Sequence, residues 1–270
     1  MSFSIAGKTA IVTGAANGVG LAIARHFVDQ GARVMCADMD EDGLVAQHGE
    51  AAGAEDPQVA YYAGDLREKL TIANLLSATI DAFDGVDILV NASRQVLPSD
   101  PLCVDDDNVT ELLEQNLMTS LRLTQQVAKW MIARAEKEEI RDGQIGSIVN
   151  LSSIAARRTQ PDLLGFSIST AAVEQMTRAM AVALSPHRIR INAVAFGSVM
   201  SANLQSVLAD SPEMRGEIVS KTPLGRIAPA SDVASAVQYL ASEGSSFMTG
   251  QVLTVDGGRT LVDTVHIPAH

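Results

Sequence analysis

Short apolar runs alternate along the chain with longer stretches in which apolar residues recur every three or four positions. The short runs predict β-strands at Thr9–Thr13, Arg33–Ala37, Val59–Tyr62, Ile88–Val90, Ser147–Leu151, Arg190–Val194 and Val252–Val255. The longer stretches predict helices near residues 19–30, 41–52, 68–83, 109–135, 163–184 and 230–241. Several strand runs are apolar throughout, which is typical of strands buried on both faces. The alternation therefore predicts an α/β fold with a doubly wound parallel sheet of about seven strands and helices on both faces.

This arrangement would bring the carboxyl ends of the strands to one edge of the sheet, where ligands bind. The chain length fits one large domain, and we expect residues 1–270 to form it. Residues 196–228 carry few strand signals. We expect them to form a mobile region with short helices over the ligand edge.

A glycine-rich turn separates the first strand from the first helix in the sequence TAIVTGAANGVG. Its glycines are Gly14, Gly18 and Gly20, with the spacing G-x-x-x-G-x-G. Glycine lets the backbone turn tightly and approach a ligand, and the helix that follows points its first N–H groups at the turn. The pattern predicts a site for the pyrophosphate of a nucleotide. The alternative is a glycine-rich turn that holds no ligand.

Polar residues follow the next three predicted strands. Asp38 ends the second strand, where its carboxylate would accept hydrogen bonds from ribose hydroxyls and repel a 2′-phosphate. It therefore favours NAD(H) over NADP(H), although a solvated loop acid is the alternative because further acids follow directly. Asp65 and Leu66 follow the third strand, where a carboxylate could meet the adenine amino group, and Asn91 ends the fourth.

Composition excludes several classes of function. The net charge of −12 argues against nucleic acid as a partner. No apolar run is long enough for a membrane span, and the N-terminus does not resemble a signal peptide, so we expect a cytoplasmic protein with no membrane partner. The two cysteines cannot form a disulfide framework, and no metal-ligand spacing occurs.

The residues resemble the short-chain dehydrogenase/reductase family, of its classical type. Residues 13–20 match its T-G-x-x-x-G-x-G motif, and the likeness extends from Lys8 to Gly258. The C-terminal sequences TGQ and VDGG look like the final strand of the bacterial β-ketoacyl (3-oxoacyl-carrier-protein) reductases and their relatives. The resemblance implies a Rossmann fold, a nicotinamide cofactor and a homotetramer, with a dimer as the fallback. In such tetramers a tail like residues 259–270 can reach a neighbouring subunit, and a frayed end is the simpler alternative.

The resemblance also implies roles for individual residues. Ser153 falls on the family's catalytic serine, and Asn116 falls on its catalytic helix asparagine. The residues expected to contact the cofactor are Thr13, Gly14, Asn17, Gly18, Val19, Gly20, Asp38, Asp65, Leu66, Asn91, Ala92, Gly197 and Val199.

Four departures from the family pattern fall on the chemistry. The family's Y-x-x-x-K motif is replaced here by Phe166 and Thr170. The N-N-A-G after the fourth strand reads Asn91-Ala92-Ser93-Arg94, and the P-G after the sixth reads Phe196-Gly197. Reduction of a ketone needs an acid that gives a proton to the oxygen, and neither a phenyl ring nor an unassisted threonine hydroxyl is such an acid. Arg94 either fills the pocket, binds a carboxylate or phosphate, or is a plain surface arginine.

Two functions remain open from the sequence. The first is an NAD(H)-binding oxidoreductase of a ketone or secondary alcohol whose activity is weak or non-standard, because the standard tyrosine and lysine are replaced. The alternative is a non-catalytic NAD(H)-binding relative with a structural, sensing or partner-binding role. The sequence does not name the small-molecule substrate or ligand.

Overall fold

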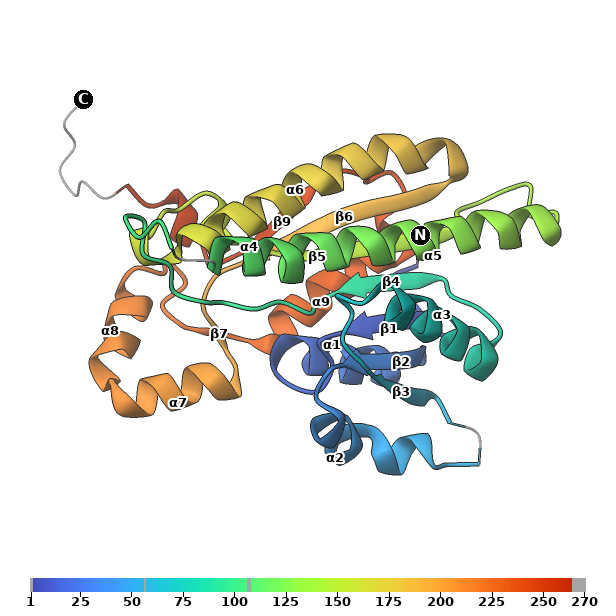
Figure 1. Ribbon diagram of the computed structural model, residues 1–270, viewed down its shortest axis with the longest axis horizontal. Helices are drawn as coiled ribbons and strands as arrows, with labels where there is room; N and C mark the ends of the chain where they lie inside the picture. Colours follow the sequence, from blue (N-terminus) through green and yellow to red (C-terminus); the bar gives the residue numbers. More distant parts are fainter. Residues whose placement is uncertain (1, 56, 106–107, 264–270) are drawn as a thin grey trace.

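The computed structural model describes residues 2–55, 57–105 and 108–263, which fold around a parallel β-sheet (Figure 1). Within these residues, seven strands lie in the order β3-β2-β1-β4-β5-β6-β9, and every neighbouring pair is parallel. The strands are β1 (Thr9–Thr13), β2 (Arg33–Asp38), β3 (Val59–Ala63), β4 (Ile88–Asn91), β5 (Gly146–Ser153), β6 (Ile189–Phe196) and β9 (Val252–Val255). Strand order reverses between β1 and β4, which is the usual place of a ligand crevice. The predicted doubly wound parallel sheet is confirmed.

Helices cover both faces of the sheet. They are α1 (Gly18–Asp29), α2 (Glu41–Ala52), α3 (Lys69–Phe83), α4 (Asn108–Leu112), α5 (Thr119–Lys137), α6 (Leu164–Leu184) and α9 (Ala230–Ala241). Single 3₁₀ turns lie at Ile154–Ala156, Pro161–Leu163, Ser185–His187, Glu243–Ser245 and Arg259–Leu261. Across the described part of the chain, we find no helix with both the length and the apolar character needed to span a membrane.

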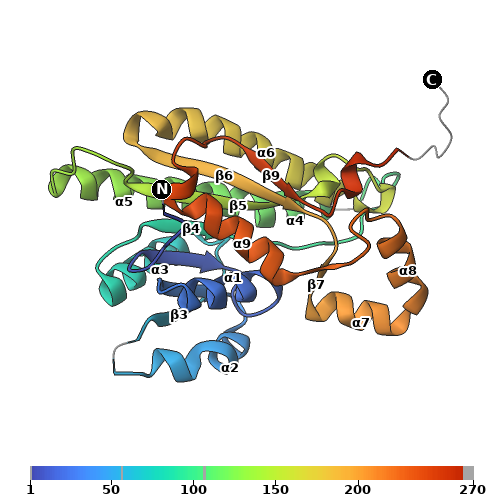
Figure 2. The ribbon, with the colours of Figure 1, turned by 180° about the vertical axis from the view of Figure 1, so that it is seen from behind.

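Successive residues of each strand enter two hydrophobic cores, one on each face. On β1, Ala10 and Val12 pack into the core under α1 and α9, whereas Ile11 packs into the core under α3 and α5. Figure 2 shows α1 and α9 side by side, and Figure 1 shows α3 and α5 on the opposite face. Because neither face of the strand meets water, both sets of positions are apolar, which explains the continuous apolar runs.

Five strands are longer than the sequence indicated: β2, β3 and β4 each extend by one residue, and β5 and β6 extend further. The prediction ended β5 at Leu151 and β6 at Val194, but the strands continue to Ser153 and Phe196, which pair directly. Polar Ser152 and Ser153 hid the end of β5 because they break its apolar run. Ser153 therefore lies within the sheet, and its pairing with β6 fixes its backbone.

The helix expected at residues 109–135 is not continuous. It consists of α4, a π-helical turn η1 (Leu113–Met118) and α5. The Thr119 hydroxyl donates to the Glu114 carbonyl oxygen, five residues back, at 3.1 Å. This bond spans the wide turn. Turns of this kind are common at functional sites, and this one carries Asn116.

The region 196–228 contains the short helices that the sequence led us to expect. They are α7 (Ala202–Asp210) and α8 (Pro212–Ser220), flanked by β7 (Val199–Met200) and β8 (Ala228–Pro229), which pair with each other in parallel. Figure 1 shows α7 and α8 beyond the carboxyl ends of the strands. Of the tail 259–270, residues 264–270 lie outside the described residues.

The glycine-rich turn packs more closely against protein than the sequence suggested. Gly14 has a φ of +67°, and a Cβ there would lie 2.9 Å from the Ser93 Cα. A Cβ on Gly20 would lie 2.1 Å from the Gly14 carbonyl oxygen. Gly14 and Gly20 therefore allow backbone to meet backbone, and a ligand is not the nearest neighbour of either position. Gly18 is different, because its φ is +58° and nothing lies within 4 Å of its Cβ position.

We expect Gly20→Ala to lower the free energy of unfolding by about 1–3 kcal/mol, because the added methyl group overpacks the turn. Denaturant unfolding followed by circular dichroism measures the change. Gly216→Ala is the matched control, since its Cβ position in α8 is open and its φ is helical. Equal stability of the Gly20 variant and the parent chain would contradict this account of the turn.

Candidate functional site

The glycine-rich turn presents an open helix N-terminus at the crevice beside β1. Asn17 is the N-cap residue of α1, and its side chain makes no capping hydrogen bond. The first N–H groups of α1, beginning at Gly18 and Val19, therefore lack a side-chain acceptor from the cap. Together with the open space at Gly18, this arrangement fits the phosphate groups of a nucleotide.

Thr13 ties the turn to the end of β4. Its Oγ1 accepts hydrogen bonds from the backbone N–H groups of Ala92 at 3.0 Å and Ser93 at 2.9 Å. These bonds hold two carboxyl-terminal strand ends together at the crevice. The side chain of Thr13 is 2% exposed, so its contribution to the site is the placement of this backbone.

Asp38 lies against the glycine-rich turn from the end of β2. Its Oδ2 accepts from the Ala16 N–H group at 3.0 Å, and its Oδ1 accepts from the Asp40 N–H group at 3.2 Å. The carboxylate is partly exposed and borders the crevice. The structure therefore brings Asp38 to the turn, as the nucleotide hypothesis requires.

Asp65 is engaged by a neighbour that the sequence analysis did not consider. The Arg67 guanidinium reaches its carboxylate, with 2.6 Å between Nη2 and Oδ2. Hydrogen bonds from the Arg67 side chain hold the pKa of Asp65 below its usual value, so the group stays ionised. Leu66 is 6% exposed and packs into the core, so it offers the crevice only its backbone.

The side chain of Asn91 makes its hydrogen bonds within the protein. Its Nδ2 donates to Thr124 Oγ1 at 3.1 Å and to Asn150 Oδ1 at 2.8 Å, and the residue is 4% exposed. The amide joins β4 to β5 and α5, and the predicted contact of Asn91 with the cofactor stays a prediction. The neighbouring Ala92 is also buried, at 7% exposed.

Gly197 and Val199 follow the end of β6. The Gly197 N–H group donates to the Val255 carbonyl at 3.4 Å, and a Cβ on Gly197 would lie 3.2 Å from Ile154 Cδ1. Val199 begins β7 and is 6% exposed. Both residues therefore line the strand end where β6 leaves the sheet.

The residues at the implied catalytic positions are held by backbone contacts. Ser153 Oγ accepts from the Ala155 N–H group at 3.1 Å, and Thr170 Oγ1 donates to the Phe166 carbonyl at 2.8 Å. Asn116 binds both polar groups of the Gln95 backbone, at 2.8 and 3.0 Å. The threonine hydroxyl is thus spent on its own helix, and the asparagine anchors the segment after β4.

Arg94 joins three of the four departures into one cluster. The guanidinium carbon lies 4.1 Å from the Phe196 ring centre and 5.8 Å from the Phe166 ring centre. Its Nη1 donates to the Ser152 carbonyl at 3.4 Å. Burial lowers the pKa of Arg94 to about 10, which still leaves the group protonated near neutral pH. Arg94 is therefore no plain surface arginine, because its guanidinium packs against both aromatic rings.

This cluster lies near Ser153, because Phe196 pairs with Ser153 and Arg94 donates to the carbonyl of Ser152. Phe166 is 5% exposed and Ser153 is 8% exposed. The side chains here offer a hydroxyl, an amide and a fixed cation. No group among Ser153, Asn116, Phe166 and Arg94 exchanges a proton near neutral pH. The hydroxyl, the amide and the guanidinium are groups that can polarise an oxygen.

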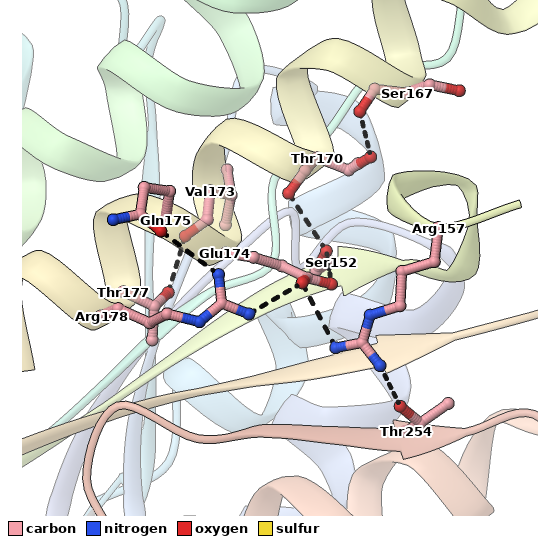
Figure 3. A network of polar contacts seen from close by, with 10 residues as sticks. All are labelled: Ser152, Arg157, Ser167, Thr170, Val173, Glu174, Gln175, Thr177, Arg178 and Thr254. Carbon is pink, nitrogen blue, oxygen red and sulfur yellow. Dashed lines mark hydrogen bonds and ion pairs between the residues drawn. The ribbon is translucent and has the colours of Figure 1, made fainter. Parts of the chain in front are cut away.

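A buried carboxylate near this cluster escaped the sequence analysis. Glu174 is 5% exposed and accepts from Arg157 Nη2 and Arg178 Nη2, each at 3.3 Å, and from Ser152 Oγ at 3.4 Å. Figure 3 shows Glu174 between the two guanidinium groups, beside Ser152. The four-residue spacing of Glu174 and Arg178 on one helix was the signal that could have identified the pair. Among the described residues, no group of three or more His, Cys, Asp or Glu side chains could hold a metal ion.

The family model described as enoyl-(acyl carrier protein) reductase, a model of the short-chain dehydrogenase/reductase family, matches residues 14–260. An uncharacterised oxidoreductase of Mycobacterium tuberculosis is 33% identical, covering 96% of this chain and 94% of the relative. A 3-oxoacyl-[acyl-carrier-protein] reductase of Thermotoga maritima is 30% identical, covering 94% of this chain and 98% of the relative.

Two solved structures extend the comparison. A 7α-hydroxysteroid dehydrogenase complexed with NADH and 7-oxo glycochenodeoxycholic acid superposes with a TM-score of 0.85 at 29% identity, covering 95% of each chain. A gluconate 5-dehydrogenase from Burkholderia cenocepacia in complex with NADP and tartrate gives a TM-score of 0.85 at 26% identity, covering 97% of this chain and 98% of that one. The two neighbours thus carry different nicotinamide cofactors.

We expect Glu174→Gln to lower the free energy of unfolding by about 1–3 kcal/mol. Breaking a buried ion pair costs more than this, but Arg157 and Arg178 are 42% and 46% exposed, and water compensates part of the loss. Denaturant unfolding measures the effect, with Glu136→Gln on exposed α5 as the matched control. A loss no larger than that of the control would show that the bridge does not stabilise the fold.

Proposed function

The chain belongs to the short-chain dehydrogenase/reductase family, and from this premise we propose that it binds NAD(H) and acts on a ketone or secondary alcohol only weakly or by a non-standard route. One observation carries the proposal. The family's tyrosine and lysine positions hold Phe166 and Thr170, and Arg94 packs on the phenyl ring. The family is one of oxidoreductases, so the activity proposed here is a weaker version of the family's own reaction.

The residues around the glycine-rich turn fit the adenosine diphosphate half of the cofactor best. The open N-terminus of α1 and the space at Gly18 would receive the pyrophosphate, and Asp38 would accept from the ribose hydroxyls. The same carboxylate would repel a 2′-phosphate, and this supports NAD(H) over NADP(H). The bound cofactor would supply the hydride.

The residues at the implied catalytic positions support only slow turnover. Phe166 has no proton to give, and the Thr170 hydroxyl donates to the helix backbone. Ser153 could still polarise a carbonyl oxygen, and Arg94 adds a fixed positive charge nearby. A positioned general acid is worth about 10²–10⁴ in rate, so its loss alone would reduce turnover strongly.

A second function is a non-catalytic NAD(H)-binding protein with a structural, sensing or partner-binding role. The position of Arg94 favours it, because the guanidinium lies against both Phe166 and Phe196. A substrate carbonyl that approached Ser153 would have to displace this packing. The two functions therefore differ in whether Arg94 leaves room for a substrate.

We also propose a homotetramer, with a dimer as the fallback. Helix α6 exposes small and apolar side chains at spacings of three and four around the polar Gln175, namely Ile168, Ala171, Ala179 and Val182. Such a stripe suits pairing across a two-fold axis. Both cysteines are free thiols, and Cys103 is exposed, which supports a reducing compartment such as the cytoplasm.

Calorimetry with both cofactors tests the first part of the proposal. We expect NAD(H) to bind at least about tenfold more tightly than NADP(H). Asp38→Ala should reduce this ratio, because it removes both the ribose acceptor and the charge that repels the 2′-phosphate. Equal affinities in the parent chain, or a preference for NADP(H), would contradict the role given to Asp38.

Restoring the missing groups tests the catalytic part. Phe166→Tyr and Thr170→Lys should each give little alone, because the phenol needs the ammonium to lower its pKa. We expect the double variant to gain more than the product of the single gains, and Arg94→Gly added to the pair to give the largest rate. Loss of NADH absorbance with a panel of ketones measures turnover.

Two controls make this test decisive. Ser153→Ala in the triple variant should abolish the gain if the restored site carries the reaction. Robust turnover in the unmodified chain that survives Ser153→Ala would show that another site is used. No gain in the triple variant, with NADH still bound, would favour the non-catalytic function.

Light scattering at micromolar concentration tests the assembly. We expect the mass of a tetramer, or of a dimer, and we expect Ala179→Glu to reduce it because the added charge lies within the α6 stripe. Val207→Glu on α7 is the matched control outside that stripe. A monomer in the parent chain would contradict the proposal.

A further inference from the structure

A cavity lies next to the strand ends that carry Gly197 and Val199. It has a volume of about 610 Å³ and lies where β6 and β9 end, beside the 3₁₀ turn Arg259–Leu261. Ligand pockets in proteins have about this volume. None of the residues expected to contact the cofactor or the reacting groups lines it. The cavity is therefore a candidate for a separate site.

Three arginines line the cavity, and they differ in how they are paired. Arg226 forms an ion pair with Asp232 at 2.8 Å, and Arg157 pairs with the buried Glu174. Arg259 donates from Nη1 to Ser198 Oγ at 3.0 Å, and no carboxylate of the described residues forms an ion pair with it. Arg259 is thus the cation of the cavity whose charge is not balanced.

The remaining acid of the cavity is occupied by its own loop. Asp256 accepts from the Gly258 N–H group at 2.9 Å and from the Thr260 N–H group at 2.7 Å, one bond to each oxygen. Burial alone would raise the pKa of Asp256, but these hydrogen bonds keep it below its usual value. Asp256 is therefore held by backbone N–H groups, and no ion pair with a described residue holds the guanidinium of Arg259.

The cavity lining also includes apolar residues. They are Pro223, Leu224, Ala228, Val255 and Leu261. Leu224 is 67% exposed and Leu261 is 85% exposed. Covering these two side chains would remove apolar surface from water, so a ligand with an apolar part gains from contact with this apolar lining.

The loops around the cavity are held in place without a ligand. A Cβ on Gly257 would lie 2.7 Å from Thr222 Cγ2, and the Leu224 N–H group donates to the Gly257 carbonyl at 3.1 Å. Figure 3 shows Arg157 held from one side by Glu174 and from the other by Thr254. A ligand would meet fixed donors, so little order must be gained on binding.

We propose that this cavity binds a small monocarboxylate with an apolar body, the carboxylate on Arg259 and the apolar part against Leu224 and Leu261. A carboxylate would accept charge-assisted hydrogen bonds from the Arg259 guanidinium, and the apolar lining favours an anion with an apolar body. The proposal does not depend on the cofactor, because the cavity shares no residue with the cofactor site.

Isothermal titration of the full chain with decanoate tests this proposal. We expect saturable binding to one site per chain. Decanol, which has the tail without the charge, and acetate, which has the charge without the tail, should each bind at least about tenfold more weakly. Arg259→Gln should weaken decanoate by about ten- to a hundredfold, because a hydrogen bond to a charged group is lost.

Arg141→Gln is the matched control, since Arg141 is an exposed arginine that does not line this cavity. Circular dichroism establishes that each variant is folded, and Leu261→Ser tests the apolar lining if Arg259→Gln is unstable. The proposal is overturned if decanoate fails to bind, if decanol binds as well as decanoate, or if Arg141→Gln weakens binding as much as Arg259→Gln. NADH affinity should be unchanged in Arg259→Gln, which separates this test from that of the cofactor site.

Discussion

The close approach of two backbones at the glycine-rich turn is the contact on which the crevice depends. Gly14 meets the Ser93 backbone without room for a Cβ, and Thr13 Oγ1 binds the N–H groups that follow β4. The position of Ser93 sets the position of Arg94, the next residue. Geometry at the start of the chain thus determines which side chain packs against Phe166 and Phe196.

Phe166, Phe196 and Arg94 are physically linked. A phenyl ring at 166 and another at 196 create two aromatic faces, and Arg94 lies against both. A cation with no carboxylate partner among the described residues costs less beside aromatic rings than in an aliphatic pocket. The three side chains therefore stabilise one another, because the two rings give the Arg94 guanidinium a favourable surface to pack against.

The fold could be read from the sequence because strands buried on both faces must be apolar throughout. Thr9–Thr13 and Val252–Val255 were predicted with their observed bounds. The site was less readable, because polar side chains have no periodicity that tells which way they point. Asn91 turns into the interior to join two strands. The π-helical turn at Asn116 leaves no mark in a pattern of threes and fours, and Glu174 read as one charge on a helix.

Arg94 would also affect which oxidation state of a nicotinamide ligand binds beside the cluster. A nicotinamide ring is positively charged when oxidised and neutral when reduced. A fixed guanidinium in low-dielectric surroundings would repel the oxidised, positively charged ring and would exert no such repulsion on the reduced, neutral ring. A crevice that keeps this arginine in place would distinguish the two forms by charge alone, and so would respond to the redox balance around it even without turning over a substrate.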